Sequence, residues 1–140
     1  MKNIDNKYYT PEIEEFHVGF EYEIQANDDS TEFDKIRISR DKKSFVFMNT
    51  YALNNIPFDV RVKHLNREDI ESFGFKVTDT TTSETLIQYS LGTYLLYEVK
   101  NTNKIGVKEI IETGIVENLF YGTIKNKSEL NRLLKQLQII

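Results

Sequence analysis

The sequence predicts an α+β fold in which a mostly antiparallel sheet of about seven to nine short strands packs under a C-terminal amphipathic helix. Short runs rich in β-branched and aromatic residues recur along the chain, and turn-forming residues separate them. A long leucine repeat of helical spacing follows near the C-terminus. The helical insertions of about 10–15 residues that parallel βαβ units need are missing, so the strands should form an antiparallel meander.

The length and composition favour one folded domain over residues 1–140. Hydrophobic residues make up 39% of the chain and charged residues 29%, and the nine Phe and eight Tyr supply a large apolar volume. This volume is enough to offset the chain entropy that folding removes, and 140 residues is an ordinary size for one domain with one core. We expect residues 1–13 to form an extended N-terminal arm.

The first half of the chain is predicted to consist mainly of strands. Residues 14–25 alternate strictly between polar and apolar side chains, the pattern of a half-buried strand, with the apolar series from Phe16 to Ile24 facing inward. Turn formers predict an exposed loop over 25–31, and Pro57 limits residues 51–53 to at most one helical turn. Further strands are expected at residues 33–39 and 44–49, which form a hairpin, and at residues 58–64.

The second half is predicted to hold both helices. Asn66 can cap a short helix over about residues 67–73, which Gly74 ends. Asn126 caps a C-terminal helix over about residues 127–138, whose leucines repeat on one face and should cover the sheet. The strands expected in this half are residues 75–78, 85–89, 94–100, 105–111 and 116–124.

Composition also excludes several functional classes. The chain has no cysteine and two histidines, which excludes disulfides, thiolate metal sites and a histidine-rich zinc site. A net charge of −4 argues against sequence-independent nucleic-acid binding, which depends on Lys and Arg. The N-terminus lacks the apolar segment of a signal peptide, and no run approaches the roughly 20 apolar residues of a membrane span. We therefore expect a cytoplasmic protein without a membrane partner.

Three stretches of the chain have a specific sequence pattern. They are YYTPEIEEFHVGFEYE over residues 8–23, LNREDIESFGF over residues 65–75, and GTIKNKSEL over residues 122–130 with the helix that follows. Together they resemble a family of short uncharacterised proteins of Bacteroidota phages and prophages. The resemblance covers the two ends and the middle of the chain, and it brings no catalytic residues. It implies a genomic setting in which small acidic accessory proteins often act in host takeover or counter-defence.

One candidate site is formed by His17, Glu21 and Glu23, which share the polar face of the first predicted strand. A histidine and two carboxylates can act as an acid and base pair or bind a metal. However, residues four apart on a strand lie about 13 Å apart, too far to ligate one ion. A solvated polar strand face is the simpler interpretation, and we predict no metal and no cofactor.

A second candidate site is basic and aromatic. Arg61, Lys63 and His64 lie along or just after one predicted strand, and such a patch could hold a phosphate or carboxylate of a ligand. Lys35 and Arg37 would extend the patch if their strand lies beside it. The alternative is cross-strand pairing of these cations with Glu15, Glu21 and Glu23. The full set of predicted ligand-binding residues is Arg61, Lys63, His64, His17, Glu21 and Tyr51.

Tyrosines form a candidate interface. Tyr8 and Tyr9 lie on the extended N-terminal segment, and Tyr94 and Tyr97 add aromatic surface later in the chain. Tyrosine rings suit protein interfaces and base stacking. The alternative is that the first two tyrosines hold the N-terminal arm against the core.

No catalytic motif is present, so the first functional hypothesis is a noncatalytic phage or prophage accessory protein, active in counter-defence. It would bind a host protein or sequester a small anionic, nucleotide-like ligand. A minor structural or assembly protein is the alternative, and a hydrolase built on His17, Glu21 and Glu23 is a third hypothesis. Exposed sheet edges also make a homodimer or a higher homo-oligomer reasonable.

Overall fold

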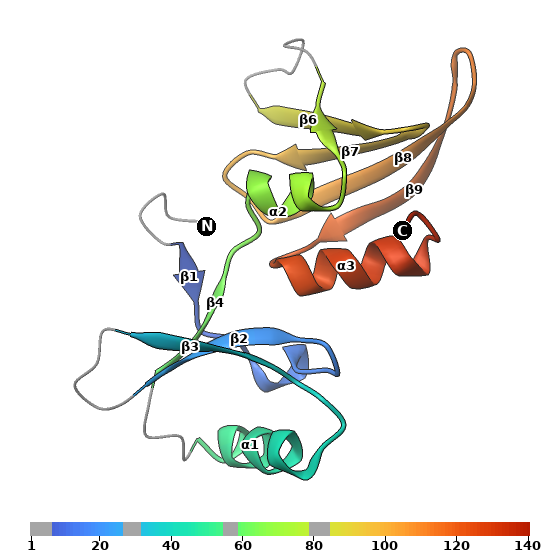
Figure 1. Cartoon of the computed structure of the whole chain (residues 1–140). Coiled ribbons are helices and arrows are strands. Elements are labelled where there is room, and N and C mark those ends of the chain that lie inside the picture. Colours follow the sequence, from blue (N-terminus) through green and yellow to red (C-terminus); the bar gives the residue numbers. More distant parts are fainter. Residues whose placement is uncertain (1–6, 27–31, 55–58, 79–84) are drawn as a thin grey trace. The chain divides into compact units, whose positions relative to one another are not determined.

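The computed structural model of the chain describes residues 7–26, 32–54, 59–78 and 85–140. Over these residues it contains a four-stranded and a five-stranded sheet, both antiparallel, and three α-helices (Figure 1). This architecture is α+β with a mostly antiparallel sheet, which confirms the predicted fold class. Among the described residues, no helix combines the length and the apolar composition that crossing a membrane requires.

The contacts within the chain form two compact units. We call Lys7–His64 the N-terminal unit and Leu65–Ile140 the C-terminal unit. Each unit has a hydrophobic cluster of its own. Among the described residues, the one core that the chain length predicted is therefore divided in two, while a single domain over residues 1–140 stays a prediction.

The N-terminal unit is a four-stranded sheet with one α-helix. Its strands, in order across the sheet, are β1 (Tyr8–Tyr9), β4 (Val60–Lys63), β2 (Glu21–Gln25) and β3 (Phe33–Arg37). A short 3-10 helix, η1 (Ile13–Glu15), precedes β2, and α1 (Lys42–Ala52) follows β3. The rings of Phe47 and Tyr51 on α1 stack on Tyr22 and Phe16, with centroids 4.7 and 4.8 Å apart. The aromatic stack thus joins α1 to the sheet.

The predicted strand over residues 14–25 is wrong in its first half. Its start is the 3-10 helix η1, and a turn at Gly19, which has a φ of +94°, precedes β2. That backbone conformation favours glycine, and it breaks the alternation. Val18 is exposed as a result, whereas Phe16, Phe20 and Tyr22 are buried as predicted.

The predicted strand over residues 44–49 is also wrong, because this segment belongs to the helix α1. The Asp41 carboxylate accepts a hydrogen bond from the Ser44 backbone N–H at 2.7 Å and caps the helix. Phe47 and Tyr51, four residues apart, face the core, while Phe45 is exposed. The short alternation of aromatic residues therefore explains why the sequence predicted a strand here. Residues 51 and 52 complete the helix.

Other predictions in this unit hold over the described residues. Val60 and Val62 of β4 are buried, as the alternation predicted. Tyr8 and Tyr9 are extended and pair with β4. The N-terminal end of the predicted arm, the centre of the loop over 25–31 and the start of the strand over 58–64 lie outside the described residues.

The C-terminal unit confirms the predicted meander. Its strands, in sequence order and in order across the sheet, are β5 (Lys76–Val77), β6 (Leu86–Leu91), β7 (Tyr94–Val99), β8 (Lys104–Glu112) and β9 (Ile115–Thr123). The two predicted helices are also present, as α2 (Arg67–Ser72) and α3 (Lys127–Gln136). Asn66 and Asn126 cap them through bonds from the backbone N–H of Asp69 and Glu129.

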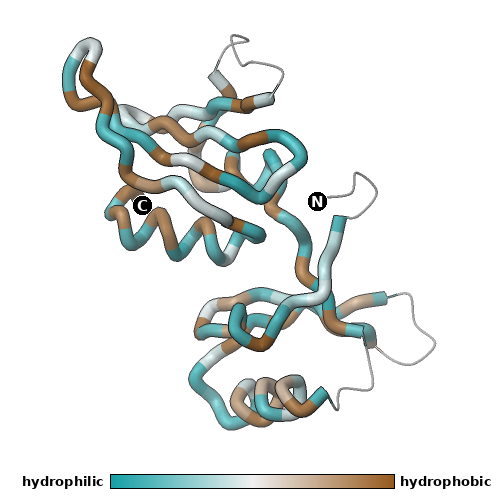
Figure 2. The backbone as a smooth tube through the Cα atoms, turned by 180° about the vertical axis from the view of Figure 1, so that it is seen from behind, coloured by the Kyte–Doolittle hydropathy of each residue, from teal (hydrophilic) through white to brown (hydrophobic). Residues whose placement is uncertain are grey.

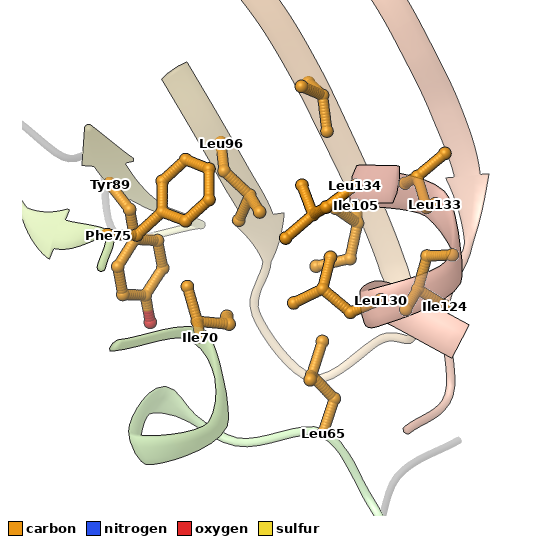
Figure 3. Close-up of a cluster of buried hydrophobic side chains, with 11 residues drawn as sticks. Leu65, Ile70, Phe75, Tyr89, Leu96, Ile105, Ile124, Leu130, Leu133 and Leu134 are labelled. Atoms are coloured by element: carbon orange, nitrogen blue, oxygen red, sulfur yellow. The ribbon is translucent and has the colours of Figure 1, made fainter. Parts of the chain in front are cut away.

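Both helices of this unit pack on the same face of its sheet. Leu130, Leu133 and Leu134 of α3 and Ile70 of α2 belong to one buried cluster with strand residues such as Leu96 (Figure 3). Because strand side chains alternate between faces, the residues between the buried ones point to the opposite face. We call this opposite side, which neither α2 nor α3 covers, the open face.

Candidate functional site

Arg61, the centre of the predicted basic site, is already paired. Its strand β4 lies beside β2 with Glu23 directly opposite. The Arg61 Nε and Nη2 atoms donate to Glu23 Oε1 at 3.1 and 2.9 Å. This is the cross-strand pairing that the sequence offered as the alternative, and it neutralises the cation.

Aromatic rings also cover the Arg61 guanidinium. Its central carbon lies 3.7 Å from the ring centroid of Tyr8 and 3.6 Å from that of Phe33. Two rings that close to a planar group occupy its two faces, and Glu23 takes its edge. Arg61 is therefore engaged by Glu23 and by two rings, which makes it a poor candidate for binding a ligand anion.

The remaining predicted polar residues of this sheet follow the same pattern. Glu21 forms an ion pair with Arg37 at 2.9 Å and lies 3.9 Å from Lys35. His17 lies in the turn before β2, where its Nδ1 is 2.9 Å from the Glu15 carbonyl oxygen. Among the described residues, no group of His, Asp and Glu could hold a metal ion. The structure thus places His17 on a different element from Glu21 and Glu23.

The predicted tyrosines of this unit hold the N-terminal segment on the sheet. The Tyr9 hydroxyl donates to Glu15 at 2.6 Å, and the Tyr51 hydroxyl donates to the Pro11 carbonyl. Burial, with the nearby Glu15 charge, raises the pKa of Tyr51. The His64 ring lies 4.8 Å from that of Tyr9, and Lys63 lies opposite Tyr8 on the neighbouring strand. These contacts are those of a docked arm, the alternative to an interface.

A different arrangement is found on the open face of the C-terminal unit. Tyr97 on β7, Gly106 on β8 and Tyr121 on β9 lie in one row across three neighbouring strands. A Cβ atom at Gly106 would lie 2.0 Å from Tyr97 Cζ, so the Tyr97 ring occupies the space above the glycine. The two tyrosine rings are stacked, with centroids 6.2 Å apart and planes at 24°. We call Tyr97, Gly106 and Tyr121 the tyrosine row.

Lysines flank the tyrosine row along β8. Lys104 and Lys108 are each two residues from Gly106 and therefore share its face. The Lys108 ammonium lies 5.1 Å from the Tyr97 ring centroid, and within the described part of the chain no carboxylate lies within ion-pair distance of it. A shallow cavity of about 440 Å³ adjoins the Lys108 side chain. The residues that line this cavity are Tyr97, Lys108, Asn118, Leu119, Phe120 and Tyr121.

This arrangement can bind a ligand with a flat apolar part and an anionic group. The tyrosine rings offer stacking surface, and Tyr121 is 60% exposed. The Lys108 ammonium can contact an anion, and the Asn118 amide can donate to or accept from the ligand. No nucleophile with an adjacent base lies among the residues that line this cavity.

Sequence reasoning identified only one member of this site. Tyr97 was predicted as an interface residue, but Tyr94 packs against the core, because residues three apart on a strand face opposite sides. Lys108, Asn118 and Tyr121 were missed. Gly106 in the middle of a strand was the available signal, because a missing side chain there often marks a close approach of another group.

Comparison with known proteins adds no functional assignment to this geometry. No protein-family model, no curated protein and no solved structure matches the chain. The resemblance to phage proteins therefore stays a prediction.

Proposed function

We propose that the protein is a noncatalytic binding protein that sequesters a small, planar, anionic ligand of nucleotide type on its open face. The observation that carries the proposal is the tyrosine row with Lys108 beside it, which forms no ion pair with any residue that the structure describes. We further propose, from the resemblance in sequence alone, that it serves a phage or prophage as an accessory protein, in counter-defence.

Stacking supplies the first part of the recognition. The Tyr97 ring rests on Gly106 and beside Tyr121, so its position is set before a ligand arrives. Stacking of a nucleobase on an aromatic side chain contributes about 1–3 kcal/mol and tolerates different bases. The row thus favours a flat heterocycle over an aliphatic ligand.

Charge supplies the second part. Lys104 and Lys108 lie on either side of Gly106 along β8, so a phosphate attached to a stacked base would meet an ammonium group. The Lys104 ammonium also donates to the Thr123 hydroxyl at 3.0 Å, which holds it at this face. The net charge of −4 opposes a long polyanion, so the site suits a mononucleotide better than a nucleic acid.

Titration of the whole protein with AMP, followed by amide NMR shifts, tests this function. We expect saturable shifts at Tyr97, Gly106 and Lys108, and weaker binding of adenosine and of ribose 5-phosphate, because each lacks one half of the recognised chemistry. AMP should be recovered unchanged after prolonged incubation, as a noncatalytic role requires. Absence of saturable shifts with all three probes would refute the proposed site.

Two variants and one control sharpen the test. Gly106→Ala displaces the Tyr97 ring from the space above residue 106. We expect this variant to lose AMP binding. The fold should persist, because the clash is with the far end of a side chain. Lys108→Met should weaken binding about three- to tenfold through loss of a charged contact. Lys135→Met, on the exposed surface of α3, should bind like wild type. Equal affinity in all three variants would place the ligand elsewhere.

A further inference from the structure

The hairpin formed by β8 and β9 extends beyond the rest of its sheet. The last contacts of β7 with β8 are the Tyr94 and Glu109 pair and a bond from the Ile110 N–H to the Thr93 carbonyl. Beyond this point the pairing of β8 with β9 continues without β7. The hairpin projects from its sheet in both views of the chain (Figures 1 and 2). We call residues 109–117 the hairpin tip.

The hairpin tip exposes aliphatic side chains. Ile111 is 54% exposed and Ile115 50%, and Ile110 and Val116, which lie opposite each other, are exposed as well. Isolated exposed apolar residues are ordinary, but four of them on one projecting hairpin, with Ile110 and Val116 side by side, favour an interaction surface. The tip therefore offers apolar surface that a partner could cover.

The charge of the hairpin tip restricts that partner. Glu109, Glu112 and Glu117 lie in the tip, which contains no Lys or Arg. Glu109 and Glu117 lie directly opposite each other, and like charges in that position repel. Pairing of two tips would bring six carboxylates together, so the partner surface should be basic.

The N-terminal unit contains a groove with these properties. Its cavity has a volume of about 510 Å³ beside α1. Val18, Ile38, Phe45 and Met48 supply apolar surface, and Arg40 and Lys42 line the same groove. Phe45 is 65% exposed.

The groove has a positive charge balance, because Arg40 and Lys42 both line it. Asp41 is the acidic lining residue, and its carboxylate is engaged by the Ser44 backbone N–H at 2.7 Å as the helix cap. Lys43, the next residue of α1, is also exposed. The groove therefore matches the hairpin tip in both apolar surface and charge.

We propose that the hairpin tip of one copy of this chain docks into the groove beside α1 of a second copy. The exposed isoleucines would cover Val18 and Phe45, and Arg40 and Lys42 would offset the Glu109 and Glu117 repulsion. Because the two surfaces differ, the contact is heterologous, and it generates a closed ring or an open chain of subunits. The tyrosine row takes no part in it, so this proposal stands or falls independently of the nucleotide site.

Sedimentation velocity of the full chain over a range of concentrations is the experiment. We expect wild type to associate with rising concentration, and to associate less as NaCl is raised. Ile111→Asp in the tip and the double variant Arg40→Glu and Lys42→Glu in the groove should each weaken association more than about tenfold. Ile140→Asp is the matched control, because Ile140 is an exposed isoleucine outside both surfaces, and it should associate like wild type.

Mixing the two defective proteins decides between this contact and any other. The Ile111→Asp protein keeps an intact groove and the groove variant keeps an intact tip, so their mixture should form a 1:1 complex that does not grow further. Wild type that remains monomeric at every concentration overturns the proposal. Association that persists in both variants also overturns it and would indicate pairing through the β9 edge. A mixture that remains monomeric overturns it as well. AMP titration of the Ile111→Asp protein should match wild type in all cases.

Discussion

Arg61 in the N-terminal unit and Lys108 in the C-terminal unit are both cations placed over the ring of a tyrosine on a neighbouring strand. They differ in what surrounds their charge. Arg61 has Glu23 at 2.9 Å and a second ring at 3.6 Å, whereas Lys108 adjoins a cavity lined by polar and aromatic side chains. The first cation stabilises its unit, and the second is available to a ligand.

This difference shows that strand register determines which cations are available to a ligand. Glu21 and Glu23 on β2 lie opposite Arg37 on β3 and Arg61 on β4, so acids and bases meet across the sheet. On the open face, the neighbours of Lys108 on adjacent strands are Leu95 and Asn118, and neither is acidic. A cation-rich strand is therefore a weak predictor of an anion site unless its cross-strand neighbours are known.

The largest expected effect tests whether the two units have independent cores. Leu134 is completely buried in the C-terminal unit, and Leu134→Ala should lower the free energy of unfolding by about 2–5 kcal/mol. Because the clusters are separate, amide exchange should accelerate in β6 to β9 and not in β2 to β4. Urea unfolding and hydrogen exchange provide the two measurements.

The matched control for this prediction is Leu53→Ala. Leu53 is a leucine exposed at the end of α1, and its truncation should change the free energy of unfolding by less than about 0.5 kcal/mol. Equal acceleration of exchange in both sheets of the Leu134→Ala protein would show that the units unfold as one cooperative structure. That result would remove the distinction between them.

An intermediate effect concerns alkaline pH. Burial raises the pKa of Tyr22 in the N-terminal unit from 10.0 to about 12. Burial and the Glu98 carboxylate, which accepts its hydroxyl bond at 3.0 Å, raise the pKa of Tyr89 in the C-terminal unit. The unfolded chain loses these protons first, so the stabilisation is present below pH 10 and is lost as the pH rises toward 12.

Urea unfolding between pH 8 and pH 11.5 measures this loss. Tyr22→Phe and Tyr89→Phe should each reduce the slope of stability against pH above pH 10, because phenylalanine cannot ionise. Tyr8→Phe is the matched control, because the Tyr8 side chain on β1 is only partly buried. An unchanged slope in both core variants would contradict the assignment to these tyrosines.

The smallest expected effect compares the two cations directly. Glu23→Gln leaves Arg61 without its carboxylate and should lower the free energy of unfolding by about 1–2 kcal/mol. Lys108→Met removes no ion pair among the described residues and should change the free energy of unfolding by less than about 0.5 kcal/mol, although we expect it to weaken AMP binding. Thermal and urea unfolding of both variants check the contrast, and a larger loss in Lys108→Met would show that Lys108 is structural.

Local sequence patterns were sufficient to predict an element where its caps or its apolar spacing lie within or beside that element. The caps at Asn66 and Asn126, the leucine repeat and the alternation at Val60 and Val62 each specify structure within a few residues. The same reasoning failed at residues 44–49, where the aromatic alternation was too short to distinguish a strand from the helix α1. The helix cap at Asp41 is the local signal that distinguishes the two.

By itself, the sequence determined the fold class, the meander of the C-terminal unit and the two capped helices of that unit. It offered the pairing of acids and bases in the N-terminal unit as one of two alternatives. Only the tertiary structure decided which cation is neutralised and which tyrosines lie together. Arg61 meets Glu23 across 38 residues, and Tyr97, Gly106 and Tyr121 meet from three strands. Such contacts depend on strand register, and register follows from the packing of whole sheets rather than from the residues beside each side chain.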